Sequence, residues 1–257
     1  MNYFFKRWAV KMYMALFLVV FCWMLNQPLL SILTQLLDSI KRHDLSLELY
    51  LQPEYISGLL VSLKVSVLGG FFAAIFCALV AYALAVFEFR FKKIILLLML
   101  IILCTPFTFQ IVPLIIGTLK LGLINQHIAM WLPFVTPILG VFIIKQFIET
   151  IINSELIEAA RMEGASEWYL FVKIIIPLIK PAMVLIFLIQ FSFIWYLFFY
   201  PMIMIPDESI QPLSMMTGGF IPIGNIPLGN MIFTMVPVLI TILCSGYIYK
   251  FIKSDIA

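Results

Sequence analysis

Residues Val65–Phe87 read VSVLGGFFAAIFCALVAYALAVF and contain no charged side chain. About 20 apolar residues are enough for a helix to cross the ~30 Å hydrocarbon core of a bilayer. Further stretches without an acid or a charged base, and with the neutral His127 as their one titratable exception, cover residues 12–37, 94–119, 121–144, 181–206 and 209–249. So many long apolar runs predict an all-α integral membrane protein.

The composition supports this prediction. Hydrophobic residues make up 64% of the 257 residues and charged residues 11%, against roughly half and roughly a quarter in soluble domains. The last run opens with a Gly- and Pro-rich stretch, so its helix is expected to start late. A single domain over residues 1–257 is expected, with six spans at about 12–35, 60–87, 94–119, 127–146, 177–204 and 228–250.

The basic residues of the connections predict the orientation, because positive charge is retained on the cytoplasmic side. With a cytoplasmic N-terminus, twelve lie inside: Lys6, Arg7, Lys11, Arg90, Lys92, Lys93, Lys145, Arg161, Lys173, Lys180, Lys250 and Lys253. Four lie outside: Lys41, Arg42, Lys64 and Lys120. Both termini are therefore expected in the cytoplasm.

The connection between spans four and five, about residues 149–173, is longer than a helix hairpin needs. Ser154 can cap a first helix and Gly164 can end it in a left-handed conformation. A second short helix can start at Ser166, with Glu167 favourable to its N-terminus. This pattern predicts a helix-turn-helix outside the membrane, and taken alone it also fits an amphipathic elbow on the lipid surface.

The same connection resembles the EAA signature of the membrane-spanning permease subunits of ABC type I importers. Its elements are Glu158-Ala159-Ala160, Gly164, and an ending in which Ile176 replaces the usual Leu before Pro177. The resemblance implies a coupling helix that docks in a cleft of the ATP-hydrolysing subunit. The residues that it assigns to coupling are Glu158, Ala159, Ala160, Arg161, Gly164, Ala165, Ile174 and Pro177.

The details resemble the carbohydrate branch, specifically the six-span partner in maltose, glycerol-phosphate and oligosaccharide permeases. The supporting segments are Ala81-Tyr82-Ala83-Leu84, Phe89-Arg90-Phe91, Leu121-Gly122-Leu123-Ile124-Asn125, Ser154-Glu155-Leu156 and Gly164-Ala165-Ser166. Two features depart from the branch. Tyr196 and Leu197 follow Trp195 where Asn and Glu are usual, and the Gly-Ala-Val-Lys-Gly type of C-terminal tail is absent.

The resemblance implies a multi-pass permease subunit in a bacterial cytoplasmic (inner) membrane that lines half of the path of a sugar or oligosaccharide. The expected partners are a second permease subunit, forming a heterodimer, two ATP-binding subunits, an extracellular or periplasmic solute-binding protein and the lipid bilayer, but no nucleic acid. The chain has no Gly-x-x-x-x-Gly-Lys-Ser/Thr phosphate loop. It is therefore expected to be no enzyme and to hold no cofactor, with ATP and Mg bound by the partner ATPase.

Polar and aromatic residues within the spans are the candidates for the solute path, because aromatic faces stack on sugar C–H groups and amides or hydroxyls answer sugar hydroxyls. These candidates are Gln110, Gln190, Ser192, Trp195, Tyr196 and Tyr200. Each aromatic residue fits equally well as membrane-helix filler or an interface anchor.

Three alternatives were compared with this interpretation. A membrane enzyme lacks support, since His43 and His127 have no metal set around them and the four cysteines show no paired spacing. A self-contained channel or secondary transporter usually needs ionisable residues within its spans for proton or cation coupling, and the long apolar runs of this chain contain no acid or charged base. The same machine could carry a polyamine or another small organic solute, because the usual polar pair after Trp195 is missing.

Overall fold

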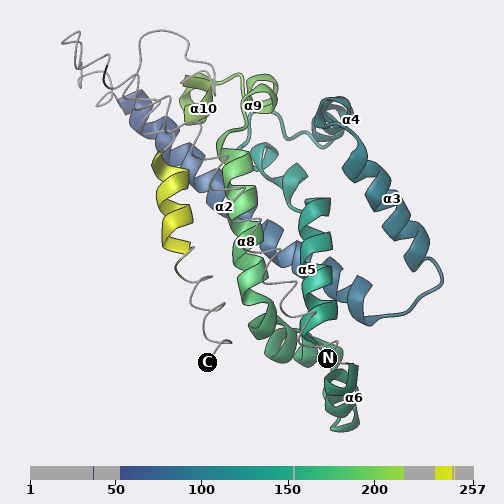
Figure 1. Ribbon diagram of the computed structural model, residues 1–257. Coiled ribbons are helices and arrows are strands. Elements are labelled where there is room, and N and C mark those ends of the chain that lie inside the picture. The colour runs from purple at the N-terminus through teal and green to yellow at the C-terminus, as the bar shows by residue number, and fades with distance from the viewer. Residues whose placement is uncertain (1–36, 38–52, 153, 217–234, 245, 247–257) are drawn as a thin grey trace.

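The computed structural model describes residues 37, 53–152, 154–216, 235–244 and 246, and this described part is helical without a strand. Figure 1 shows its helices running side by side, with one short helix, α6, projecting from one end. The expected span 12–35 lies outside the described residues. Of the expected span 228–250, the helix Met235–Cys244 is described.

Helix α2 (Pro53–Val86) is the centre of the packing. It packs most extensively against α8 (Ile176–Trp195) and next against α5 (Ile138–Ile151). Small residues allow this close approach. A Cβ added to Gly70 would lie 2.9 Å from the carbonyl oxygen of Phe187 in α8, so a larger residue there would push the two helices apart.

The expected span 94–119 consists of two helices, α3 (Lys92–Cys104) and α4 (Phe107–Lys120), which are bent by 108° relative to each other. Pro106 lacks an N–H and disfavours a helical conformation in the residue before it. Thr105 is accordingly extended, with φ −79° and ψ 125°. Figure 1 shows the pair as an arm at the side of the bundle.

The expected span 127–146 also begins irregularly. Two 3₁₀ turns, η2 (His127–Met130) and η3 (Leu132–Phe134), precede α5. The break before α5 bends this pair by 46°. Because α5 continues to Ile151, it takes in the first residues of the predicted 149–173 connection.

The fifth apolar segment starts earlier and ends earlier than the expected 177–204. The short helix α7 (Glu167–Tyr169), the π-helical turn η4 (Leu170–Ile175) and α8 form one continuous helix, Glu167–Trp195. Three short helices follow: α9 (Phe199–Met204), η5 (Glu208–Ile210) and α10 (Leu213–Met216). By length and composition, two described helices can cross a membrane, or up to four if each bent pair is one span.

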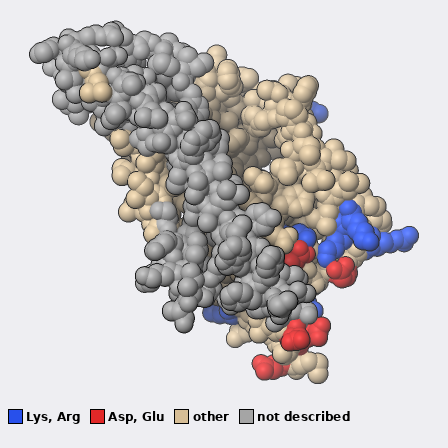
Figure 2. All heavy atoms as spheres, viewed as in Figure 1, with Lys and Arg blue, Asp and Glu red and all other residues tan. Residues whose placement is uncertain are grey.

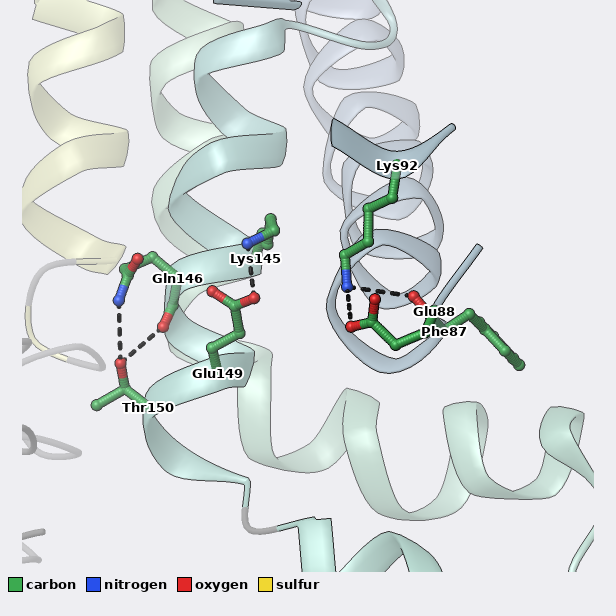
Figure 3. A network of polar contacts seen from close by, with 7 residues as sticks. All are labelled: Phe87, Glu88, Lys92, Lys145, Gln146, Glu149 and Thr150. Carbon is green, nitrogen blue, oxygen red and sulfur yellow. Dashed lines mark hydrogen bonds and ion pairs between the residues drawn. The ribbon is translucent and has the colours of Figure 1, made fainter. Parts of the chain in front are cut away.

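Charged side chains are distributed unevenly. On the face in Figure 2, acidic and basic side chains gather mainly at the end of the molecule where α6 lies. Figure 3 shows two local ion pairs in this region, between Lys92 and Glu88 at 2.7 Å and between Lys145 and Glu149 at 2.6 Å. Lys92 also donates to the Phe87 carbonyl just past the end of α2. The hydrogen bond from Lys92 lowers the pKa of Glu88.

Candidate functional site

Six of the eight predicted coupling residues, those from Glu158 to Ala165, lie on or just after α6 (Ser154–Met162). Glu158 and Ala159 are exposed, Ala160 is half-buried, and Met162 is 89% exposed. Ile157 points the other way and is buried in the main core cluster. The helix therefore has one anchored face and one free face on the chain as described, an arrangement suited to docking against another protein.

Gly164 ends α6 with φ +84°, as the sequence predicts. Its N–H donates to the Arg161 carbonyl at 3.0 Å, and the N–H of Ala165 donates to the Ala160 carbonyl at 3.0 Å. These two bonds define a Schellman motif, which favours glycine at its left-handed position. An added Cβ would meet nothing within 4 Å, so backbone conformation and not crowding within this chain favours glycine.

The turn after Gly164 also forms as predicted. Ser166 caps the next helix by accepting a 3.2 Å hydrogen bond from the N–H of Tyr169. That helix runs on without interruption, so Ile174 and Pro177 belong to it and not to a loop. Ile174 is half-buried and Pro177 exposed. The C-terminal end of the motif is therefore part of the helix that continues into α8.

Arg161 binds a residue that the sequence pattern did not suggest. Glu158 lies one turn before Arg161 in the sequence, but Arg161 Nε donates to Glu167 Oε1 at 2.8 Å. This bond raises the pKa of the guanidinium, which stays charged. The other carboxylate oxygen, Glu167 Oε2, accepts a 2.8 Å hydrogen bond from the Tyr82 hydroxyl of α2. Glu167 thus connects α6 to α2.

A cavity of about 360 Å³ lies beside the α3–α4 bend, α5 and α8. Phe107, Phe134 and Phe193 give it aromatic walls, and the two predicted path residues Gln110 and Gln190 both line it. Apolar walls with a few polar groups are typical of sites for small organic ligands.

The side-chain amides of both glutamines donate hydrogen bonds to backbone carbonyls where a helix is interrupted. Gln110 Nε2 donates to the carbonyls of Ile102 at 3.1 Å and Thr105 at 2.8 Å, where α3 ends. Gln190, 3% exposed, donates from Nε2 to the Phe134 carbonyl at 2.9 Å. Carbonyls freed by a broken helix need such donors in an apolar environment, and this explains why amides stand among apolar residues.

The other candidate path residues lie elsewhere. Trp195 is 1% exposed and stacks on Phe191 with ring centroids 5.6 Å apart, in a cluster that also contains Tyr196. The hydroxyl of Tyr200 lies 2.7 Å from that of Thr118 in a separate cluster. Ser192 is buried, and its hydroxyl makes no hydrogen bond within the described residues. The structure therefore brings only Gln110 and Gln190 to the cavity.

Replacing Gln190 by methionine is expected to lower stability by ~1–3 kcal/mol, because the side chain keeps its volume while the buried Phe134 carbonyl loses its donor. Thermal unfolding of the purified chain in detergent measures this. Gln146→Met is the control, since Gln146 is exposed and its amide donates to the Thr150 hydroxyl one turn away on α5 (Figure 3). Unchanged unfolding together with weaker solute response would instead make Gln190 a solute contact.

No three His, Cys, Asp or Glu side chains of the described residues lie together as a metal site requires.

Residues 50–257 match a family described as the binding-protein-dependent transport system inner membrane component. The chain belongs to this family. The prediction of an importer permease component rather than an enzyme is thereby confirmed.

Two of the similar proteins are arabinooligosaccharides transport system permease proteins AraQ. That of Bacillus subtilis is 30% identical over 193 residues, covering 74% of this chain and 67% of the relative. That of Halalkalibacterium halodurans is 32% identical over 170 residues, covering 65% and 61%. The matched part thus spans about three fifths to two thirds of these relatives.

A solved structure shares the fold. It is a chain of a bacterial ABC transporter involved in the import of the acidic polysaccharide alginate, with a TM-score of 0.62 and 17% identity over 80% of this chain and 77% of that chain. This similarity and the helical structure of the described residues both agree with the expected permease fold.

Proposed function

We propose that this chain is a membrane-spanning permease subunit of a bacterial ABC importer for a sugar or oligosaccharide. The observation that carries the proposal is α6, an exposed helix with the EAA residues on it, in a chain of this transport family. Its exposed Glu158 and Ala159 offer a surface for docking, while the buried Ile157 fixes it to the core.

We infer a single domain over residues 1–257 with six spans and both termini in the cytoplasm. The support is the charge distribution: Lys92, Lys145 and Arg161 are all counted as cytoplasmic from the sequence, and each makes an ion pair. On the face in Figure 2, charged side chains gather mainly at the end where α6 projects. The region about 149–173 is then the cytoplasmic coupling element, with α6 as its docking helix.

The proposed machine has further chains. A second permease subunit, forming a heterodimer, completes the path; two ATP-binding subunits hold ATP and Mg; and a solute-binding protein delivers the solute from outside. In this chain, α6 follows the movement of the ATPase to which it docks. The continuous helix Glu167–Trp195 starts two residues after the α6 turn at Gly164 and Ala165 and reaches the cavity at Gln190. Movement of α6 therefore has a rigid route to the membrane region.

A saccharide is the proposed cargo because most of the relatives' names refer to saccharides: arabinooligosaccharides, melibiose, raffinose and stachyose, or lactose. One relative is named instead for sn-glycerol-3-phosphate, a phosphorylated polyol. Among the described residues that line the cavity there is no acid or charged base, and the polar groups include Gln110 and Gln190. Neutral amides suit hydroxyl-rich solutes better than they suit a strongly charged one.

The test is ATP hydrolysis by the complex reconstituted from this chain and its partner permease, ATPase and binding protein. A panel would contain neutral oligosaccharides, uronate oligosaccharides and polyamines. Stimulation by a saccharide is expected. Stimulation by a polyamine alone would overturn the cargo, and failure of the chain to assemble with an ATPase subunit would overturn the importer assignment.

Replacing Glu158 by lysine is expected to weaken binding of the ATPase subunit at least ten-fold. The lysine would face the basic group of the ATPase that Glu158 is proposed to meet, and like charges in an interface cost several kcal/mol, where ~1.4 kcal/mol is ten-fold. Titration of the purified ATPase subunit onto the permease pair measures this. Glu208→Lys is the matched control, an exposed reversal on η5, far along the chain from α6. Equal binding by both variants would remove Glu158 from the docking face.

A further inference from the structure

We propose that Glu167 is a positioning residue through which displacement of α6 reaches α2. The inference rests on the proposed function, because it assigns a second route by which the docking helix moves the membrane helices. The first route is the chain itself, from α6 through Gly164 into α7 and α8. The second crosses space from α6 to the end of α2.

The core of this second route is a carboxylate that accepts two hydrogen bonds. Arg161 Nε of α6 donates to one oxygen of Glu167 and the Tyr82 hydroxyl of α2 donates to the other, each at 2.8 Å. Tyr82 is buried, whereas Glu167 and Arg161 are exposed. Charged hydrogen bonds of this length are stronger than neutral ones. Three separate elements are therefore held by one side chain.

Aromatic contacts surround the same point. The Arg161 guanidinium lies 5.9 Å from the centre of the Phe87 ring, just past the end of α2. Phe87 meets the Tyr82 ring edge-on at 5.7 Å, and Tyr82 also packs on Phe171 of η4 at 5.2 Å. We call Tyr82, Phe87, Arg161 and Glu167 the α2–α6 brace. Within it every member touches two others, so a shift of α6 displaces both ends.

The position of Tyr82 makes this contact consequential. It lies in the last turns of α2, the helix that packs most extensively against α8 and α5. A displacement of this end of α2 would be transmitted to α8 and α5 through close-packed small residues such as Ala78 and Ala81, which are fully buried. Coupling between sites needs contiguous contacts of this kind together with an element that can move.

The experiment uses the assembled complex in nanodiscs and the variants Glu167→Gln, Tyr82→Phe and the double variant. Glu167→Gln keeps the size and removes the charge, and Tyr82→Phe removes only the hydroxyl. The matched control is Glu208→Gln, which removes the charge of an exposed carboxylate on η5, outside both the brace and the coupling segment.

Two readouts separate the brace from the importer function. A spin label at Met162, in a background with the four cysteines replaced by alanine, reports the mobility of α6 without any solute. The ratio of solute-stimulated to basal ATP hydrolysis reports coupling. Both single variants are expected to mobilise the label and to lower that ratio about three- to ten-fold, with no further loss in the double variant. Glu208→Gln is expected to change neither readout.

The outcomes are distinct. An immobile label in both variants would overturn the brace. A mobile label with an unchanged ratio would overturn its role in coupling and leave a purely structural contact. Additive losses in the double variant would show that the residues act separately. If no solute stimulated the unmodified complex, the proposed function would fail, while the spin-label result would still decide whether the brace holds α6.

Discussion

Replacing Trp195 by alanine is expected to destabilise the chain by ~3–5 kcal/mol, the usual cost of emptying a large aromatic site in a core. Trp195 is 1% exposed and stacks on Phe191, and Leu213 of α10 belongs to the same cluster. The amount of assembled complex should fall with it, since net stabilities are ~5–15 kcal/mol. From the sequence, Trp195 is one of the candidates for stacking on the solute; its burial in a core cluster predicts a loss of stability instead.

Thermal unfolding and the yield of assembled complex measure this effect. Trp168→Ala is the matched control for unfolding, because Trp168 is 68% exposed and its removal leaves no internal cavity. Trp195→Phe should recover part of the loss by keeping a ring against Phe191. A Trp195→Ala protein with normal unfolding but a raised solute concentration for half-maximal stimulation would restore the solute-stacking interpretation.

The helical segments of the described residues were predictable, because long uncharged runs leave few other structures possible in lipid. The breaks within them were not. Pro106 and Pro113 look alike in the sequence, yet Pro113 lies inside α4 while the chain bends by 108° beside Pro106. At the Pro106 break the Gln110 amide donates to the carbonyls of Ile102 and Thr105, a contact that neither proline reveals in the sequence.

The local structure of the coupling segment was predictable because it depends on residues that are close together in the sequence. Gly164 and the Ser166 cap depend on a few neighbouring residues, and both form as expected. Tyr82 and Glu167 are 85 positions apart, and their contact depends on how α2 packs against the turn after α6. No periodicity or spacing in the sequence contains that information.

The candidate solute residues show a further limit. Gln190 and Trp195 lie close in sequence, but a helix turns about 100° per residue, so five positions place them about 140° apart around the axis. Gln190 accordingly reaches the cavity, whereas Trp195 packs in another cluster. A cluster of polar and aromatic residues can indicate which span lines a cavity. Which residues of that span face the cavity depends on how the neighbouring helices pack against it.

Replacing Gly164 by valine is expected to reduce solute-stimulated ATP hydrolysis five- to thirty-fold while membrane insertion stays normal. At φ +84° a β-branched residue is strongly disfavoured, and the left-handed conformation costs an L-residue ~1–2 kcal/mol, a factor of 5–30 in population. The Schellman bonds to Arg161 and Ala160 would open, and α6 would lose the orientation in which Glu158 meets the ATPase.

Two further substitutions divide the effect into its causes. Gly164→Asn should stay close to the unmodified protein, since asparagine tolerates positive φ and an added Cβ meets nothing within 4 Å. Gly164→Asp has the same shape and a negative charge, so any loss beyond that of asparagine reports charge at the docking surface. Stimulated turnover and bound ATPase would be measured on each purified complex. Normal turnover in the valine variant would show that the turn does not transmit force, because its backbone constraint would then have no functional consequence.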